Sequence, residues 1–404
     1  MKKLELYLHI PFCVRKCAYC DFLSAPAEYQ KQKVYQQALL QEIRNFPQRE
    51  AYEVSSVFFG GGTPSIFPAE WIREIMDVIR TKFHIDQDAE ITIECNPGTA
   101  DEEKLHAYKA MGINRISFGL QSANDTELQL LGRIHTWDTF LQTYQAAQKA
   151  GFSNINIDLM SALPGQTAAS WCETVQKVLQ SKPKHISAYS LIIEEGTPFY
   201  EKYAQDARKR EEGEQPEFLP SEEEEREMYH LTKRLLLESG LQRYEISNYA
   251  AEGYECRHNM GYWDGTEYAG FGLGASSLLE SGGAYYRIQN TADIEQYLQV
   301  HKASEGQNHE DFFAYQKSIG AEWIRLSEKD RMEEFMFLGL RMKKGVSEQR
   351  FEQRFQKKLR MVYGDVVQKQ IEQGLLEEQE GYLSLTDFGM DVSNLVMAEY
   401  LLDE

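Results

Sequence analysis

Three cysteines near the N-terminus form the densest group of candidate metal ligands in the sequence. Cys13, Cys17 and Cys20 lie within the segment HIPFCVRKCAYCDF. Thiolates with this spacing can each bind a different iron of a 4Fe-4S cluster, which leaves one iron open to a small molecule with an amine and a carboxylate. The alternatives are a zinc site or thiols without a shared function. A structural zinc ion takes four protein ligands, and no second cysteine pair accompanies this group, so the spacing favours the cluster.

The other cysteines are scattered along the chain at Cys95, Cys172 and Cys256. Six cysteines in 404 residues are too few for a disulfide scaffold. We therefore expect these three to be buried as small hydrophobic residues, and we expect a reducing compartment around the protein.

Glycine and polar residues end several β-rich segments of the first half. In FFGGGTPS, the glycines from Gly60 onward let the backbone approach a ligand, and free N–H and C=O groups there can bind an ammonium or a carboxylate. A tight turn is the alternative interpretation. Four polar side chains end or follow later segments: Glu94, Gln121, Arg133 and Asp158. Each alone could be a helix cap, but their order along the chain predicts a shared cleft.

These residues require a sheet of parallel strands to bring them together. We expect strands at 4–10, 55–59, 90–94, 115–120, 154–159 and 185–193, and amphipathic helices near 28–45, 69–82, 101–110, 124–150 and 167–181. Residues 99–102 resemble a capping box, and Gly112 and Gly151 fit helix C-termini. Alternating strands and helices predict an α/β fold whose ligands bind at the carboxyl ends of the strands. Six units are too few for an eight-fold barrel, so we expect an open, partial (β/α)6 parallel barrel.

The rest of the chain divides into two further regions. Residues 201–227 are highly charged and predict a solvated connection, before a helix that begins at Ser221 and ends near Ser239. The stretch 243–290 is expected to be irregular and β-rich. Helical patterns at 327–342, 347–356 and 361–373, two short strands and a last helix resemble a winged helix. The expected domains are the barrel at 1–200, an α+β segment at 201–326 and a small winged-helix-like C-terminal domain at 327–404.

The composition excludes several classes of function. The formal net charge is −20, and the winged-helix-like region is acidic as well, so binding to nucleic acid is not expected. No apolar run approaches the length of a membrane span, and the N-terminal segment lacks the features of a signal peptide. These observations predict a soluble, cytoplasmic protein.

The cysteine segment resembles a motif of a known superfamily. CxxxCxYC directly after a first strand, followed by a glycine-rich strand end, is similar to the radical S-adenosylmethionine superfamily. The resemblance implies a partial parallel barrel and a 4Fe-4S cluster whose unique iron binds S-adenosylmethionine. In that superfamily, the reduced cluster cleaves the sulfonium to methionine and a 5′-deoxyadenosyl radical.

Further segments narrow the resemblance over nearly the whole chain. YLHIPFC, IECNPGT, RISFGLQS, LLGRIHT and IDLMSALPGQT are similar to the oxygen-independent coproporphyrinogen III oxidase family and its HemW-type relatives. The resemblance implies that the three clustered cysteines hold the cluster. It also implies that the cluster-bound S-adenosylmethionine is contacted by Tyr7, Tyr19, Gly61 and Glu94. Positions that bind a second S-adenosylmethionine in the oxidase match Gly62, Thr63, Gln121, Arg133 and Asp158.

Three departures from the oxidase pattern favour the HemW-type branch. The oxidases carry a further cysteine where this chain has Phe22, and they have a long extension before the cluster loop, which is not expected here. The third departure is the match of residues 258–263 to the HNxxYW signature of HemW-type heme chaperones. The resemblance thus implies a monomer or homodimer that binds heme and transfers it to acceptor proteins, membrane-bound respiratory enzymes among them. Oxidative decarboxylation of coproporphyrinogen III is the alternative.

The signature also has the chemistry of a heme site. A neutral imidazole can bind heme iron, and aromatic rings can pack on porphyrin faces. The expected heme residues are His258, Asn259, Tyr262 and Trp263. The alternatives are a structural histidine with its aromatic neighbours in the core, and iron ligation by the Cys256 thiolate.

Overall fold

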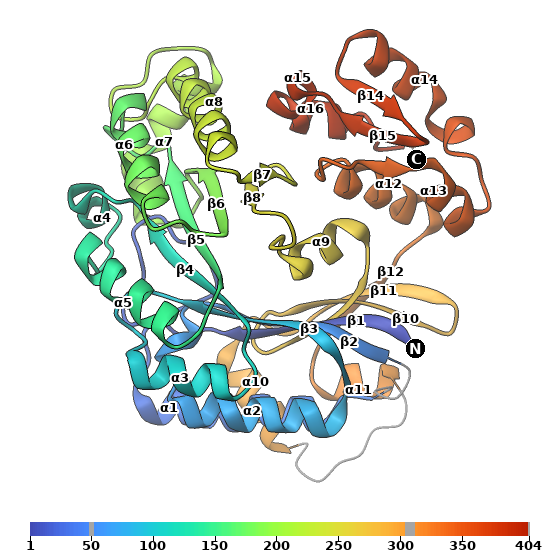
Figure 1. Ribbon diagram of the computed structural model, residues 1–404. Helices are drawn as coiled ribbons and strands as arrows, with labels where there is room; N and C mark the ends of the chain where they lie inside the picture. The colour runs from blue at the N-terminus through green and yellow to red at the C-terminus, as the bar shows by residue number, and fades with distance from the viewer. Residues whose placement is uncertain (48–51, 304–311, 403–404) are drawn as a thin grey trace.

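A single twelve-stranded sheet organises the computed structural model, which describes residues 1–47, 52–303 and 312–402 (Figure 1). Its centre consists of parallel strands in chain order: β1 (Lys2–Ile10), β2 (Tyr52–Gly61), β3 (His84–Cys95), β4 (Arg115–Gln121), β5 (Asn154–Ser161) and β6 (His185–Ser190). All six expected strands are present, and the sixth ends earlier than expected. The predicted α/β fold with a partial parallel barrel is confirmed.

The first strand shows why the central strands form. Leu4, Leu6 and Leu8 are fully buried on one face, against the helices, whereas the residues between them face the barrel interior. Because side chains alternate between the two faces of a strand, the interior receives the polar set of the sequence and the helix-covered face receives the leucines. The strands therefore carry functional groups on one side without weakening the core on the other.

Helices cover the outer face of this sheet: α1 (Tyr29–Asn45), α2 (Ala69–Lys82), α3 (Glu102–Ala110), α4 (Asp125–Leu130), α5 (Trp137–Lys149) and α6 (Ala168–Leu179). The single helix expected at 124–150 is two helices, because Gly132 has a positive φ of 76° and Thr136 caps the second helix. The capping box expected at 99–102 was also wrong. Asp101 caps α3 by accepting from the Lys104 N–H, whereas Thr99 donates to the Asn96 carbonyl.

Both edges of the sheet are extended by later parts of the chain. At one edge lie β9 (Glu267–Phe271), which is parallel to β1, and then β10 (Ser276–Ser281), β11 (Ala284–Gln289) and β12 (Glu322–Arg325). At the other edge lie β8 (Asn248–Ala250) and β7 (Gln242–Arg243). Two helices, α10 (Ile294–Ala303) and α11 (Phe312–Ser318), follow β11, and α10 contacts α1.

The charged region at 201–227 is largely helical, which corrects the expectation of a solvated connection. Helix α7 (Pro198–Glu211) begins at the Thr197 cap, with proline at its first position. Its residues Phe199 and Tyr203 are buried in a small core beneath an otherwise charged helix. The next helix, α8 (Glu222–Glu238), begins after Ser221 and ends before Ser239, as expected.

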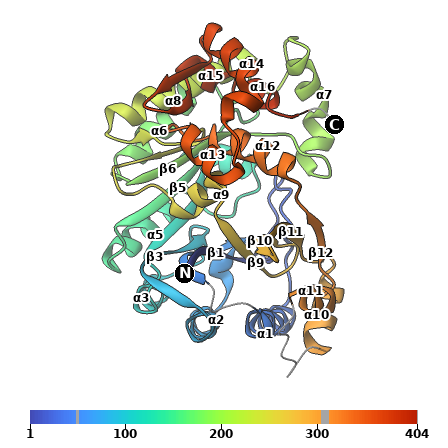
Figure 2. The ribbon, with the colours of Figure 1, turned by 90° about the vertical axis from the view of Figure 1, so that its right-hand side faces the viewer.

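Helix α9 (Arg257–Asp264) carries the HNxxYW motif, which lies in a region expected to be irregular and β-rich. The helix ends at Gly265, whose φ of +71° gives a left-handed C-cap. Figures 1 and 2 show α9 between the barrel strands and the C-terminal helices, and it contacts both β2 and α12.

The C-terminal region has a core of its own. It contains α12 (Glu328–Gly339), β13 (Val346–Ser347), α13 (Glu348–Phe355), α14 (Leu359–Glu372), β14 (Leu376–Gln379), β15 (Tyr382–Leu385), α15 (Asp387–Asp391) and α16 (Ser393–Ala398). Helices followed by a small antiparallel sheet give the expected winged-helix-like arrangement, although the last expected helix is two short ones. Among the residues that the structure describes, no helix is long and apolar enough to span a membrane.

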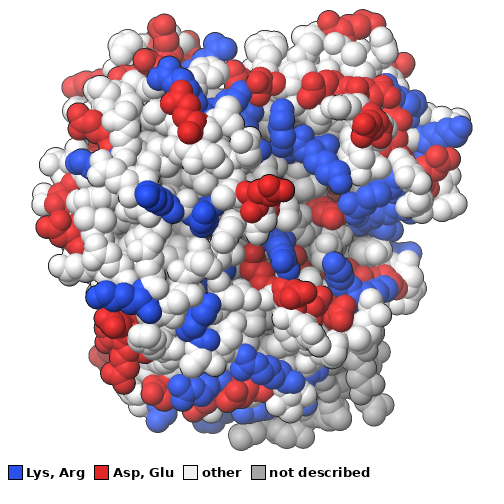
Figure 3. Space-filling model, viewed as in Figure 1, with Lys and Arg blue, Asp and Glu red and all other residues white. Residues whose placement is uncertain are grey.

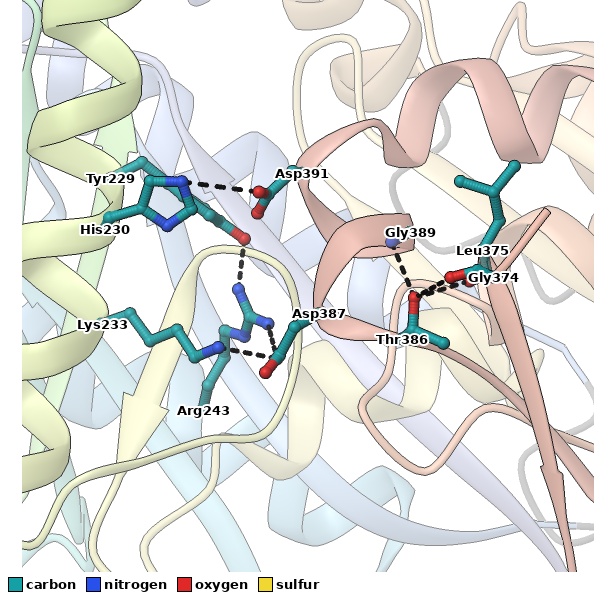
Figure 4. A network of polar contacts seen from close by, with 10 residues as sticks. All are labelled: Tyr229, His230, Lys233, Arg243, Gly374, Leu375, Thr386, Asp387, Gly389 and Asp391. Atoms are coloured by element: carbon teal, nitrogen blue, oxygen red, sulfur yellow. Dashed lines mark hydrogen bonds and ion pairs between the residues drawn. The ribbon is translucent and has the colours of Figure 1, made fainter.

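Polar contacts join this region to α8 and β7 (Figure 4). Asp387 of α15 lies 2.7 Å from the Lys233 ammonium and 3.3 Å from the Arg243 guanidinium. One turn further, Asp391 lies 3.5 Å from the His230 imidazole. These contacts hold the C-terminal region beside α8 and over α9.

Candidate functional site

A cavity of about 470 Å³ opens at the carboxyl ends of the parallel strands, where such folds bind their ligands. The side chains of Cys13, Cys17 and Cys20 line it. Eight other residues predicted from the sequence line the same cavity: Tyr19, Gly61, Gly62, Thr63, Glu94, Gln121, Arg133 and Asp158. The structure therefore brings together the whole predicted cluster and S-adenosylmethionine set except Tyr7.

The backbone fixes the cysteine loop against the end of β2. The Gly62 N–H donates to the Ile10 carbonyl at 2.8 Å, and the Thr63 N–H donates to the Phe12 carbonyl at 2.7 Å. A Cβ at Gly62 would lie only 2.5 Å from that Phe12 oxygen. Glycine is thus required at this position because no other residue allows the two segments to approach so closely.

The arrangement of the thiols suits a cluster better than a single ion. Within the described parts of the chain, no three His, Cys, Asp or Glu side chains converge on one metal position. A cubane cluster takes each thiolate on a separate iron, so three thiols spread along one cavity wall fit it. The Arg133 guanidinium donates a hydrogen bond to the Cys17 sulfur at 3.6 Å.

Two partly buried carboxyl groups face the cavity. Glu94 accepts a hydrogen bond from the Gly61 N–H at 3.1 Å, and burial together with the nearby Asp158 raises the pKa of Glu94 to about 8. Burial also raises the pKa of Asp158, although it accepts hydrogen bonds from Asn156 at 2.7 Å and Ser117 at 3.2 Å. A cationic ligand would therefore find two carboxyl groups whose ionisation it stabilises.

Sequence reasoning missed several side chains that hold the predicted site residues in position through hydrogen bonds. Asn96 donates to the Thr63 hydroxyl at 2.8 Å and accepts from Arg133 at 2.7 Å. Tyr189 donates to the Gln121 amide oxygen at 3.1 Å. Asn96 had a signal, since it follows the end of the expected strand 90–94 by two residues, in ECNPGT. Tyr189 had none, because a tyrosine in a strand is ordinarily a packing residue.

Tyr7 lies apart from the predicted cofactor set. Its hydroxyl is 3.0 Å from the His9 imidazole, and it lines another cavity, of about 390 Å³. Tyr7 is linked to the cysteine loop only through His9, whose other ring nitrogen is hydrogen-bonded to the Leu23 carbonyl at 2.9 Å.

The predicted heme residues do not face one site. His258 is 1% exposed, and its ring nitrogens lie 2.8 Å from the Ser56 hydroxyl and 3.0 Å from the Tyr262 hydroxyl. Burial, together with the charge of Arg115, lowers the pKa of His258 to about 3, so the ring is neutral. In this conformation the imidazole has no free nitrogen for iron, which agrees with the alternative of a structural histidine.

The other members of the motif point in different directions. Asn259 lines the cysteine cavity, whereas Tyr262 and Trp263 line the cavity that contains Tyr7. The guanidinium of Arg341 lies 4.3 Å from the centre of the Trp263 ring and covers one face of it. Cys256 is buried, with its sulfur 3.4 Å from a carboxylate oxygen of Glu90. Helix α9 thus separates the cysteine cavity from the cavities on its far side.

Comparisons with known proteins agree with this architecture. Residues 7–178 match the family model of the radical SAM superfamily, and residues 326–392 match that of the HemN C-terminal domain. A solved structure of the radical SAM enzyme coproporphyrinogen III oxidase (HemN) from Escherichia coli superposes with a TM-score of 0.79 at 23% identity and covers 99% of this chain and 90% of that chain. At this identity, the likeness shows the fold alone.

Curated relatives match over the whole chain. The heme chaperone HemW of Lactococcus lactis subsp. lactis (strain IL1403) is 34% identical over 403 residues, which is 100% of this chain and 98% of the relative. The heme chaperone HemW of Bacillus subtilis (strain 168) is also 34% identical, over 98% of both chains. The Escherichia coli (strain K12) protein of that name is 36% identical over 67% of this chain and 69% of its own.

Proposed function

Because the chain belongs to the HemW family of radical S-adenosylmethionine proteins, we propose that it binds heme and transfers it to acceptor proteins. The observation that carries this proposal is the match over the full length of relatives named heme chaperones. The 4Fe-4S cluster and S-adenosylmethionine are then cofactors of a binding protein rather than of an oxidase.

The cysteine cavity provides the groups that these cofactors require. Cys13, Cys17 and Cys20 would hold the cluster, which supplies a redox centre with one open iron when it is bound. The backbone of residues 60–63, with Glu94, would hold the amine or ribose of S-adenosylmethionine. Gln121, Arg133 and Asp158 line the same cavity and offer an amide, a cation and a carboxylate for the rest of the molecule or for a second copy.

Phe22 supports the chaperone over the oxidase. The oxidase pattern has a further cysteine at this position, whereas the phenyl ring here lines the cavity and is 63% exposed. A side chain without a sulfur or a proton to transfer cannot take part in radical or acid–base chemistry. Oxidative decarboxylation of coproporphyrinogen III remains the second candidate because the fold is shared with that enzyme.

A hemin titration beside an oxidase assay tests the proposal. We expect saturable hemin binding, transfer of the bound heme to an apo-acceptor such as an apo-cytochrome, and no protoporphyrinogen from coproporphyrinogen III under anaerobic, reducing conditions. The cluster-loaded protein is used in both assays. Robust decarboxylation without saturable hemin binding would contradict the heme chaperone function and support the oxidase function instead.

The role of His258 as an iron ligand is tested in the same titration. Ligation requires the ring to leave its hydrogen bonds to Ser56 and Tyr262, and hence requires α9 to shift. We propose that heme contacts α9; of the candidate residues His258, Asn259, Tyr262 and Trp263, the last two line the cavity on the side of the helix away from the cysteines. A His258→Ala variant with the same heme spectrum and affinity as the wild type would remove this histidine from the site.

Binding of S-adenosylmethionine should strengthen as the pH rises. Glu94 has a pKa raised to about 8, so it is mostly protonated at pH 6.5, and its ionised form is the stronger hydrogen-bond acceptor for the amine or ribose. We expect the affinity of the cluster-loaded protein to rise by up to about tenfold per pH unit below pH 8 and then to level off. Equilibrium dialysis at pH 6.5, 7.5 and 8.5 measures this.

The matched variants are Glu94→Gln and, as a control, Glu70→Gln on the exposed side of α2. The first should bind weakly with little pH dependence, and the second should behave like the wild type. An unchanged pH dependence in Glu94→Gln would assign the titration to another group.

The acceptor proteins, the cytoplasmic location and the choice between monomer and homodimer stay predictions from the sequence.

A further inference from the structure

A second cavity, of about 240 Å³, lies between α9 and the C-terminal region. Four cationic side chains line it: Arg331, Lys344, Arg350 and Arg354. Figure 3 shows Lys and Arg side chains gathered along the seam where the C-terminal region meets the barrel. In a chain with a net charge of −20, four cations at one cavity are a marked local excess.

The carboxylates of the cavity neutralise only part of this charge. Asp264 forms an ion pair with Arg350, and Glu334 forms one with Arg287 at 2.9 Å. Neither Arg331 nor Arg354 forms an ion pair with any residue that the structure describes. Two arginines therefore remain at the cavity without a direct ion pair, although the charges of Glu334 and Asp264 act on them from a greater distance.

These two arginines are held close together. Their guanidinium carbons lie 4.0 Å (Arg331) and 5.8 Å (Arg354) from the centre of the same ring, that of Tyr285. Burial and the charges of Arg331 and Arg350 lower the pKa of Arg354, despite the opposing effects of Tyr285 and Asp264. Like charges in such an arrangement repel one another, and a bound anion would relieve that repulsion. A Cβ at Gly265, the C-cap of α9, would lie 2.8 Å from an Arg354 nitrogen, so the end of the helix leaves room for the guanidinium.

The rest of the wall is apolar and aromatic. Met260, Trp263, Phe335 and Leu338 line the cavity beside the arginines. Trp263, Leu278 and Leu338 also line the cavity of about 390 Å³ that contains Tyr7, so the two cavities adjoin. The indole nitrogen of Trp263 is buried without a hydrogen-bond partner within the described residues. Together the two cavities fall within the size range of about 300–1,000 Å³ that is usual for ligand sites.

We propose that Arg331 and Arg354 bind the propionate carboxylates of a porphyrin whose ring lies in the adjoining aromatic cavity beside Trp263. Guanidinium groups pair with carboxylates through two parallel hydrogen bonds, and an aromatic wall suits a planar apolar ring. The site rests on the proposed heme function. It places the porphyrin on the face of α9 opposite the cysteine cavity, so that heme and cluster occupy separate positions.

Hemin and its dimethyl ester distinguish this site from unspecific binding. Absorbance titrations compare the wild type with an Arg331→Gln/Arg354→Gln variant. We expect the variant to bind hemin at least tenfold more weakly and to bind the dimethyl ester as the wild type does, because the ester has no carboxylates to lose. An Arg331→Lys/Arg354→Lys variant should recover part of the affinity for hemin.

An Arg360→Gln variant serves as the control, since Arg360 pairs with Glu348 and Glu378 away from the cavity. It should bind hemin normally. The midpoint of thermal unfolding separates a ligand site from a structural role: removing repelling cations should leave it unchanged or raise it, whereas loss of a structural contact would lower it. Unchanged hemin affinity in the double glutamine variant would overturn this site while leaving the chaperone proposal intact. Absence of hemin binding in the wild type would instead contradict the chaperone proposal itself.

Discussion

Replacing Cys17 with serine is expected to abolish assembly of the 4Fe-4S cluster. The three thiols of the cysteine loop line one cavity, and Cys95, which also borders it, lies outside the loop and is only 2% exposed. Each thiol of the loop would hold a separate iron, so the loss of one thiolate leaves a cluster with two protein ligands. After anaerobic reconstitution, iron and sulfide content and the broad absorbance near 400 nm should fall to the background level.

The controls use cysteines outside the loop. Cys172 lies half-buried on α6 and Cys256 is buried against Glu90, and neither lines the cysteine cavity, so Cys172→Ser and Cys256→Ser should assemble the cluster as the wild type does. Retention of the cluster in Cys17→Ser together with its loss in one of these variants would show that the ligand set is wrong. Circular dichroism of each protein before reconstitution separates cluster loss from misfolding.

The cluster and cofactor positions were predictable because they depend on local patterns. The spacing of the three cysteines and the glycine run are contiguous in the sequence, and the polar residues at the ends of parallel strands meet by topology alone. Eleven predicted residues consequently line one cavity. The central strands were predictable for a similar reason, since runs such as Leu4–Ile10 alternate leucines with residues of another kind, as strands with two different faces do.

The errors concern elements that tertiary packing stabilises. Helix α7 is highly charged, and only Phe199 and Tyr203 anchor it in a core, although Thr197 and Pro198 are recognisable start signals. Helix α9 has eight residues, and a helix of this length is marginal in isolation. It forms because the barrel interior and α12 enclose it. Strand β9 pairs with β1 across more than 250 residues of sequence, and no local pattern specifies that pairing.

The direction of a side chain was the least predictable feature of the site. Within α9, His258 points into the barrel, Asn259 lines the cysteine cavity, and Trp263 lines the cavities on the far side. Consecutive helical residues necessarily face different directions. When a motif turns out to be helical, its residues therefore lie on different faces of the helix, and they cannot all be assigned to the same ligand.

Gly62→Ala should displace the cysteine loop and weaken S-adenosylmethionine binding at least tenfold. The added methyl group would lie 2.5 Å from the Phe12 carbonyl oxygen and 2.9 Å from its carbon. These are backbone atoms that cannot rotate away, and the same oxygen accepts the hydrogen bond of Thr63 at 2.7 Å. The loop must therefore move, at a cost of about 1–3 kcal/mol in the free energy of unfolding.

The matched control for this steric effect is Gly364→Ala in the middle of α14. No atom lies within 4 Å of a Cβ at that position, and the backbone is helical. Alanine should therefore stabilise the protein by about 0.5–1 kcal/mol through helix propensity. Denaturant unfolding and dialysis with S-adenosylmethionine measure both variants, and we expect opposite signs of the stability change. A Gly62→Ala protein with wild-type stability and affinity would show that the cysteine loop and the β2 glycines are not in the tight contact on which the cofactor site depends.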